Sequence, residues 1–216
     1  MAANTIGLSA DDVLSTTRAV RLRLDFERVV PREVLMDCLK LAVQAPSASD
    51  SQNWQWIFID DPAKKAAIAE VYRANRAAID AHSDSSVGTE KPSPIARSGA
   101  YLVEHMQDAP FLLIPCQKGR VEKGPTGMGA TFWASVIPAT WSFCLALRSR
   151  GLGTCWTTLH LFGGGEKKVA DIVGIPYDEY SQVGLFPVAY TKGTDFKPAD
   201  RLAPERVSHW NSWHPR

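Results

Sequence analysis

Cysteine is scarce in this chain, and the cysteines present form no recognisable metal or disulfide pattern. The four thiols lie far apart, at Cys38, Cys116, Cys144 and Cys155, with neither CxxC spacing nor a histidine cluster beside them. Structural zinc sites need such closely spaced pairs of ligands. We therefore expect no metal site, and we expect four reduced, buried thiols.

An excess of charge of either sign is also missing. The chain has 24 basic and 23 acidic residues among 216, a formal net charge of +1. Nucleic acids and anionic membranes are bound through a strong positive field, which this balance does not supply. Neither is an expected partner, and any positive charge that binds a phosphate must be local.

Long hydrophobic runs are absent as well. The first thirty residues include Asp11, Asp12, Asp25 and Glu27 and contain no apolar stretch typical of a secretory signal. No later run approaches the roughly 20 apolar residues that a membrane span requires. These features favour a cytoplasmic protein.

Hydrolase and metalloprotease motifs are not found. The sequence has no GxSxG or HExxH, and its five histidines are scattered. The glycine-rich segment GPTGMG (124–129) matches neither GxGxxG nor a Walker A loop, so it is better explained as a connection or an active-site lid than as a phosphate loop.

The first half of the chain shows clear helix and strand signals. Ser9 and Asp12 resemble a capping box that opens a helix near 9–20, and Pro31 opens a second helix that stops before Pro46. The polar segment SASDSQN (47–53) predicts a loop, and WQWIFID (54–60) predicts a strand. A further helix is expected over 62–82.

The second half alternates in the same way. We expect a mobile loop or lid region within 83–127, interrupted by a buried strand at 111–116, and then an apolar core helix over 128–150 with a kink at Pro138. A strand begins at 152, a short helix over 166–173 is closed by Gly174, and a last strand covers 182–190. These elements predict one domain, 1–216, with a sheet covered by helices.

The tail from 191 to 216 has little periodicity but carries Trp210 and Trp213. Two exposed tryptophans are costly in water, so a partner subunit is expected to cover them.

Three arginines are candidates for a phosphate clamp. Arg18 and Arg21 share one helical face, and Arg201 lies in the tail segment FKPADRL. Forked guanidinium groups from separate segments suit a phosphate, although a single surface arginine is usually just solvated.

Several segments together resemble the nitroreductase family of FMN-dependent oxidoreductases. TTRAVR (16–21) is similar to the family's opening motif, APSASDSQNW (45–54) to its APSxxNxQPW loop, and RGLGTCWT (150–157) to its GLGT/S segment. VADIVGIP, LFPVAY and the tail ending in HW follow in the expected order, so that the resemblance runs from about Val13 to Trp213.

The resemblance implies an α+β fold with a central, mostly antiparallel sheet flanked by helices. It also implies an intertwined homodimer, in which the extension 191–216 packs on the partner subunit and two FMN sites lie between the subunits. On this basis Arg18 and Arg21 would lie near the FMN phosphate and ribityl chain, with Arg201 completing the clamp and Lys197 as a weaker candidate.

The same resemblance assigns the flavin ring to two further segments. The loop, from the other subunit, would border the pyrimidine and dimethylbenzene edges, and Trp156–Thr158 would offer backbone amides near N5. The residues implied to bind the cofactor are Arg18, Ala19, Arg21, Pro46, Ser47, Ala48, Asp50, Gln52, Trp156, Thr157, Thr158, Lys197 and Arg201. Ser47 and Thr157 could instead cap or turn the chain, and Trp156 could be core.

Three positions depart from the family's pattern. Ala19 stands where a serine often follows the first arginine, Asp50 stands for an asparagine, and Asn53 for the proline before tryptophan. An ionised Asp50 beside the pyrimidine edge would disfavour anionic reduced flavin. It could equally accept from the flavin N3–H or turn away into a hydrogen bond within the loop.

The activity implied is hydride transfer from NADPH or NADH through flavin N5 to a nitroaromatic, a quinone or an activated alkene, in a ping-pong cycle without a protein catalytic residue. The acceptor cleft would be lined from 72–130. Two alternatives stay open: a specialised branch that cleaves flavin or dehalogenates an aromatic, and a flavin-binding protein without turnover.

Overall fold

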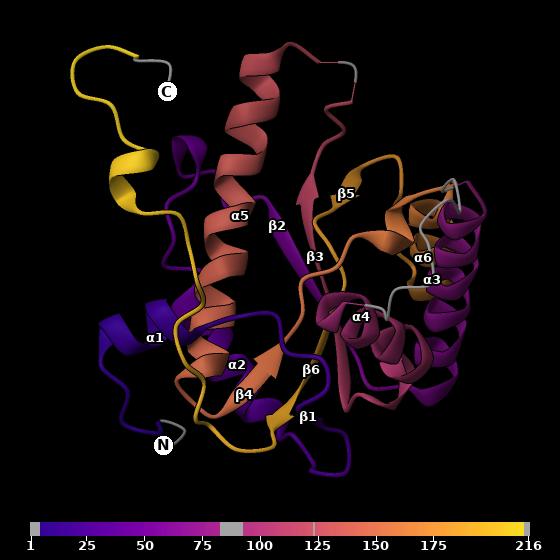
Figure 1. The fold of residues 1–216 in the computed structure, drawn as a ribbon. Helices are drawn as coiled ribbons and strands as arrows, with labels where there is room; N and C mark the ends of the chain where they lie inside the picture. The colour runs from indigo at the N-terminus through magenta and orange to yellow at the C-terminus, as the bar shows by residue number, and fades with distance from the viewer. Residues whose placement is uncertain (1–4, 83–92, 123, 214–216) are drawn as a thin grey trace.

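The computed structural model describes residues 5–82, 93–122 and 124–213. Figure 1 shows a sheet between two groups of helices. The helices are α1 (Ala10–Thr16), α2 (Arg32–Ala42), α3 (Pro62–His82), α4 (Pro94–His105), α5 (Thr126–Arg148) and α6 (Gly165–Val173). Single 3-10 turns occur at η1 (Ala48–Asp50), η2 (Met106–Asp108), η3 (Leu159–Leu161) and η4 (Pro204–Arg206).

The six strands found in the described residues form one sheet. They are β1 (Leu24–Asp25), β2 (Trp54–Ile59), β3 (Phe111–Lys118), β4 (Leu152–Thr154), β5 (Tyr180–Gln182) and β6 (Phe186–Thr191). The main order is β1-β6-β3-β2, with β4 paired to β6 and β5 to β3, and every strand pair is antiparallel. The predicted α+β class with a mostly antiparallel sheet is confirmed.

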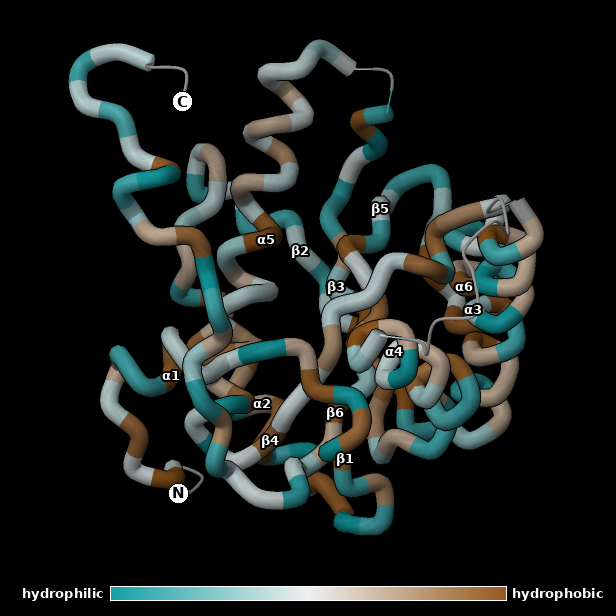
Figure 2. Tube along the Cα trace, viewed as in Figure 1, coloured by the Kyte–Doolittle hydropathy of each residue, from teal (hydrophilic) through white to brown (hydrophobic). Residues whose placement is uncertain are grey.

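Alternate residues of β3 explain the three layers. Leu112 and Ile114 pack with α3, α4 and α6 on one face, whereas Phe111 and Leu113 pack with α2 and α5 on the other. Side chains of a strand point alternately to the two faces of its sheet, so a strand that is apolar at successive positions must be covered on both. Brown segments gather between the layers in Figure 2.

Most of the observed helix boundaries agree with those predicted from the sequence. Ser9 caps α1 in a full capping box, and Gly174 ends α6 with a left-handed φ of 80°. α1 is shorter than predicted, because Thr17 is already extended. The predicted last strand is two strands, β5 and β6, since 183–185 leave the ladder. α5 remains helical through Pro138.

The range 83–127 differs most from its prediction as a loop or lid. Residues 83–92 and 123 lie outside the described residues, but most of the rest is regular. α4 covers Pro94–His105, where Ser93 accepts from the amide of Ala96 as an N-cap, and β3 runs to Lys118. Pro94 is a favourable first residue for a helix, and the prediction had treated it only as a breaker.

Burial makes the four cysteines unreactive. All are free and buried, as predicted. Burial raises the pKa of Cys38, Cys116 and Cys144 to about 12, because a thiolate is poorly solvated in an apolar environment. Within the described residues, no group of three or more His, Cys, Asp or Glu side chains could hold a metal ion.

A buried arginine at the end of α5 fixes where the tail leaves the domain. The Arg148 guanidinium donates to Thr16 Oγ1 at 2.9 and 3.1 Å and to the carbonyl of Thr194 at 3.1 Å. It lies 5.0 Å from the Phe196 ring, on which Arg23 also stacks at 4.3 Å. Burial lowers the pKa of Arg148. The tail is therefore anchored as far as Phe196.

α5 is a core helix of the domain. Among the described helices it alone has the length and hydropathy of a membrane span, and 44% of its most apolar window is buried inside the domain. Phe143 and Leu147 pack against β3, β6 and α2, as a core helix does. Its outer side keeps Ile137 and Trp141 about 40% exposed.

Candidate functional site

The predicted cofactor residues fall into two groups within the subunit. The arginine half comprises Arg18 to Arg21 and the chain after β4. The loop half comprises Pro46 to Asn53 and the adjoining part of α5. The tail residues Lys197 and Arg201 belong to neither.

The arginine half is built on an irregular pairing beside β4. Ala19 forms an isolated parallel bridge with Thr154, and the amide of Val20 donates to the carbonyl of Thr154 at 2.8 Å. This pairing holds Arg18 and Arg21 on either side of an exposed Ala19. Gly153 makes the approach possible, because a Cβ there would lie 2.7 Å from Thr191 and 3.1 Å from Val20.

Arg18 carries an unsatisfied donor. Its Nε is buried and has no hydrogen-bond partner among the described residues. A buried donor of a charged group without a partner costs free energy, on the order of 1–3 kcal/mol or more. Arg21 lies close enough to Cys155 to lower the pKa of that thiol, against the larger raising effect of burial. The two arginines therefore form a local positive site in a nearly neutral protein.

The segment after β4 is held from behind by its backbone. Thr157 donates its amide to the carbonyl of Leu185 at 3.1 Å and accepts from the amide of Leu185 at 2.8 Å. Its hydroxyl lies 2.8 Å from the phenol oxygen of the buried Tyr72 on α3. The amide of Thr157 is therefore already paired within the subunit, and the position of this segment along the flavin ring stays a prediction.

Trp156 and Thr158 differ in exposure. The Trp156 indole donates to the carbonyl of Val183 at 3.2 Å and packs partly buried against Trp54 and Val136, as a core residue does. Gly184 leaves the room for it, since a Cβ there would lie 2.5 Å from the indole nitrogen. Thr158 is exposed, so it is the accessible member of the segment.

The loop half has an unusual backbone. Ser49, Asp50 and Gln52 adopt left-handed φ angles of 52°, 51° and 46°. Each such residue is strained, and strain of this kind gathers at functional sites. The amide of Ala48 donates to Ser135 Oγ of α5 at 3.1 Å, and the amide of Gln52 donates to Ser47 Oγ at 3.2 Å.

Asp50 takes part in this internal network. Its carboxylate accepts from the Gln52 side-chain amide at 2.8 Å, and both side chains are exposed. Of the roles considered for Asp50, the hydrogen bond within the loop is thus the one present in the isolated subunit. Pro46 is likewise exposed, at the entry of the loop.

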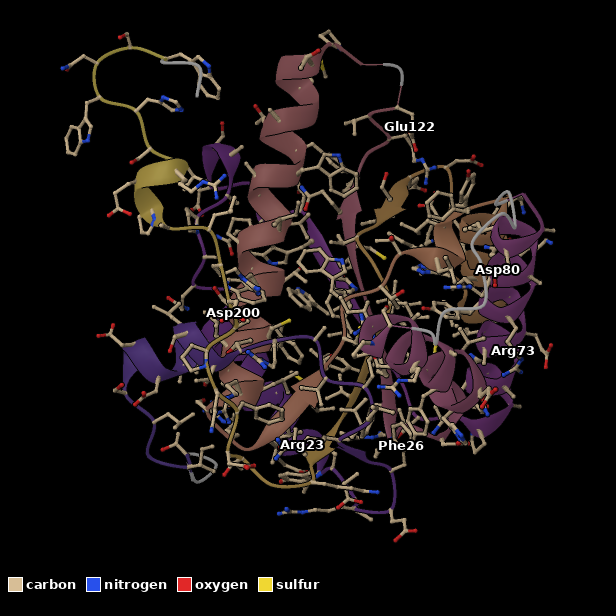
Figure 3. All side chains as sticks on the ribbon, viewed as in Figure 1. Arg23, Phe26, Arg73, Asp80, Glu122 and Asp200 are labelled. Carbon is tan, nitrogen blue, oxygen red and sulfur yellow. The ribbon has the colours of Figure 1, made fainter. Side chains whose placement is uncertain are left out.

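A cleft of about 460 Å³ opens beside this loop, between the end of β3 and the start of α5. Its lining comprises Ala48, Ser51, Asn53, Gln117, Lys118, Gly119, Arg120, Val121, Gly127, Met128, Thr131, Phe132 and Ser135. Ala48 is the one predicted cofactor residue in this set. Figure 3 labels Glu122 on the segment that borders the cleft between β3 and α5.

Arg120 fixes this border of the cleft to the domain. Its guanidinium donates to both carboxylate oxygens of Glu166 at 2.9 Å and to the carbonyl of Tyr180 at 3.0 Å, and it stacks on Tyr177 at 4.3 Å. A bidentate pair of this kind is geometrically specific. Glu166 and Tyr180 lie 46 and 60 residues from Arg120 in the sequence, so no local signal points to this arginine.

The tail arginine is not assembled with the other two. Among the described residues, Arg201 donates only to the carbonyl of Asp200, at 3.0 Å, and both Arg201 and Lys197 are exposed. Figure 3 shows Asp200 on the tail, beyond the anchored part. Trp210 and Trp213 are 84% and 77% exposed. Within one subunit, Arg201 and Lys197 are therefore not assembled with Arg18 and Arg21 into a phosphate site.

Comparison with known proteins identifies the family of this chain. The sequence profile described as the Nitroreductase family matches residues 14–190. This chain belongs to the nitroreductase family. That range includes both the arginine half and the loop half, and it ends before the tail.

The individual relatives share only a low sequence identity with this chain. The chain is 29% identical over 138 residues to the 5,6-dimethylbenzimidazole synthase of Rhodospirillum rubrum, a match that spans 60% of each chain. An iodotyrosine deiodinase structure bound to FMN and 3-iodo-L-tyrosine has a TM-score of 0.69 at 22% identity, covering 94% of this chain and 99% of that one.

A third similar protein is the FMN and NADPH-dependent nitroreductase NfnB of sphigopyxis sp. strain HMH. Its structure has a TM-score of 0.68 at 18% identity and covers 95% of this chain and 100% of its own. At these identities, the two structures establish the nitroreductase fold of this family member. Oxidoreductases with bound FMN are among the proteins that share it.

Proposed function

We propose that this chain is an FMN-dependent oxidoreductase that works as a homodimer and passes electrons from NADPH or NADH to a nitroaromatic, a quinone or an activated alkene. The observation that carries the proposal is the unpaired, buried Nε of Arg18 next to Arg21. An anionic ligand would satisfy that donor, and two arginines suit one terminal phosphate. No dinucleotide fingerprint is present, which favours FMN over FAD.

The homodimer is supported by exposed apolar surface on α5 and the tail. Ala130, Ala134, Ile137 and Trp141 recur at intervals of four, three and four residues, and all four are exposed. Such a stripe on a helix fits a packing seam with another helix. A second copy of the chain would cover it and could accept the tail, which is drawn in yellow at the edge of the molecule in Figure 1.

A dimer would also bring the two halves of the site together. In this arrangement Arg18 and Arg21 of one subunit hold the phosphate, Arg201 is supplied by a tail, and the loop half of the partner borders the ring. The strained backbone of the loop is then fixed by Ser135 before any ligand binds, which lowers the entropic cost of binding.

Bound FMN would supply the redox chemistry, since a flavin accepts a hydride at N5 from a nicotinamide and returns it to an acceptor. The residues of this chain would bind and orient the cofactor and the acceptor and shield them from water. Thr158 is the exposed residue of the segment expected along the ring. Met128 and Phe132 line the cleft with apolar side chains, which would shield a bound acceptor from water. A cytoplasmic location, where NADPH and NADH are available, is part of the proposal.

Absorption spectroscopy of the purified protein tests this function. We expect a yellow protein that releases FMN, bleaches under anaerobic NADPH or NADH, and regains its colour when a nitroaromatic or menadione is added. A colourless protein that takes up no added FMN refutes the proposal. A flavin that neither nucleotide bleaches identifies a binding protein without turnover.

The fold likeness to the deiodinase favours a second candidate, reductive dehalogenation of an aromatic. It is distinguished by adding a halogenated phenol to the reduced protein and measuring halide release. Recolouring by oxygen alone, with loss of flavin, would instead indicate the branch that cleaves flavin.

A further inference from the structure

Gln117, one of the residues that line the cleft, has a buried side-chain oxygen without a hydrogen-bond donor among the described residues. Gln117 lies near the end of β3 and is 4% exposed, and the oxygen without a partner is its Oε1. An amide oxygen buried without a donor costs on the order of 1–3 kcal/mol. Gln117 is also the last residue of an otherwise apolar buried run in β3.

The direction of this side chain follows from the register of β3. Phe111 and Leu113 pack with Phe143 and Leu147 of α5. Residues at intervals of two share a face of the sheet, so Gln117 also faces the α5 side. There the cleft separates β3 from the first turns of α5, and Gln117 is among the residues that line it.

The wall opposite Gln117 is apolar and aromatic. Phe132 and Met128 of α5 line the cleft together with Val121. Gly119 has a φ of 115°, and a Cβ there would lie 3.2 Å from the Phe132 ring. The glycine therefore lets the ring approach the end of β3. The space suits a flat, apolar ring.

Three other polar side chains of the cleft, those of Ser135, Thr131 and Arg120, already have partners. Ser135 Oγ donates to the carbonyl of Thr131 and accepts from the amide of Ala48, and Thr131 Oγ1 donates to the carbonyl of Gly127. Arg120 is bound by Glu166. Among the described residues that line the cleft, the Gln117 oxygen is a buried acceptor without a donor.

We propose that Gln117 is a specificity-determining residue that accepts a hydrogen bond from an N–H or O–H group on the ring of the electron acceptor, with that ring seated against Phe132. The cleft then selects amino- or hydroxy-substituted aromatic acceptors over analogues without a donor. The inference rests on the proposed function, because Ala48 of the loop half links this cleft to the expected position of the flavin.

The test compares two nitroaromatics that are neutral at pH 7 and differ in the donor, 3-nitroaniline and N,N-dimethyl-3-nitroaniline. Their dissociation constants are measured by titration calorimetry on the oxidised, flavin-loaded protein with no nicotinamide nucleotide present. We expect wild type to prefer 3-nitroaniline, and we expect Gln117→Leu to lower that preference about 3- to 10-fold, the value of one neutral hydrogen bond.

Gln55→Leu is the matched control. Gln55 is exposed on the neighbouring strand, and it pairs with Cys116, so it lies on the face opposite to Gln117. The same chemical change there leaves the preference at its wild-type value. Comparing ratios between variants removes the contribution of the two extra methyl groups.

An equal preference in wild type and Gln117→Leu overturns the proposal, because the oxygen then accepts no hydrogen bond from the ring of the acceptor. Loss of FMN from Gln117→Leu, with the preference unchanged, also overturns it and assigns the cleft to the flavin itself. Both results presuppose a wild-type protein whose flavin bleaches with NADPH, so they are distinct from failure of the proposed function.

Discussion

The phenol oxygen of Tyr72 and the hydroxyl of Thr157 lie 2.8 Å apart and join α3 to the segment that follows β4. Tyr72 is 6% exposed, and burial raises the pKa of its phenol. The contact fixes the side chain of Thr157, whose backbone is already paired with Leu185. The resemblance had directed attention to Thr157 but gave no indication of its partner on α3.

We expect Tyr72→Phe to lower the free energy of unfolding by about 1 kcal/mol, the usual net value of a hydrogen bond between neutral groups. Urea denaturation followed by circular dichroism measures it. Tyr101→Phe is the control, since the Tyr101 ring stacks on Phe26 and no hydrogen bond of its hydroxyl is found in the described part of the chain. Equal losses in both variants would contradict the role given to the Tyr72–Thr157 contact.

Arg201→Ala is expected to weaken FMN binding by about 1.5–3 kcal/mol, as for a lost hydrogen bond to a charged group, with the fold intact. Fluorescence titration of the apoprotein with FMN measures the affinity. Arg206→Ala provides a matched tail arginine, exposed and within η4. If Arg201→Ala binds FMN as wild type does, the tail does not contribute to the clamp.

Removal of the tail is expected to abolish the dimer and its flavin together, because a subunit that completes its partner's site has little cofactor affinity alone. Deleting 195–216 also removes Asp195 and Phe196, which bind Arg23 and lie near Arg148. Deleting 198–216 keeps those anchors and is the cleaner variant. Light scattering and the flavin spectrum are the measurements, and a stable, flavin-loaded monomer would contradict the proposal.

His160 predicts a loss of stability in mild acid. Burial lowers the pKa of His160 to about 4, and its Nε2 lies 3.2 Å from Gln182 Oε1. The Gln182 amide donates to the carbonyl of Glu166, so its oxygen faces the ring and Nε2 carries the proton. The folded state therefore holds a neutral imidazole, whereas the unfolded chain binds a proton below about pH 6.5.

Because the folded pKa is depressed, this contribution to stability is complete above about pH 6.5 and is lost as the pH falls towards 4. The full loss amounts to about 3 kcal/mol, at 1.36 kcal/mol per pH unit. Denaturation midpoints measured between pH 7 and 4 should fall more steeply in wild type than in His160→Asn, which has no titrating group. Parallel pH profiles would show that His160 is accessible to protons in the folded state.

The sequence by itself determined most elements of this fold, although α4 was not predicted. The capping box at Ser9, the left-handed Gly174 and the apolar runs that became β3 and α5 are local signals, and each depends on residues within a few positions of one another. The motifs that resemble the nitroreductase family are equally local, which is why the class of fold and the family were predicted correctly.

The tertiary structure alone decided which polar groups already have hydrogen-bond partners. Backbone pairing with Leu185 occupies the amide of Thr157, Gln52 binds Asp50, and the unpaired oxygen of Gln117 is left facing α5. These partners come from segments without a sequence signal that relates them, except for Asp50 and Gln52. Hydrogen-bond pairing across a sheet depends on register and layer packing, and a single sequence encodes these only through the whole fold.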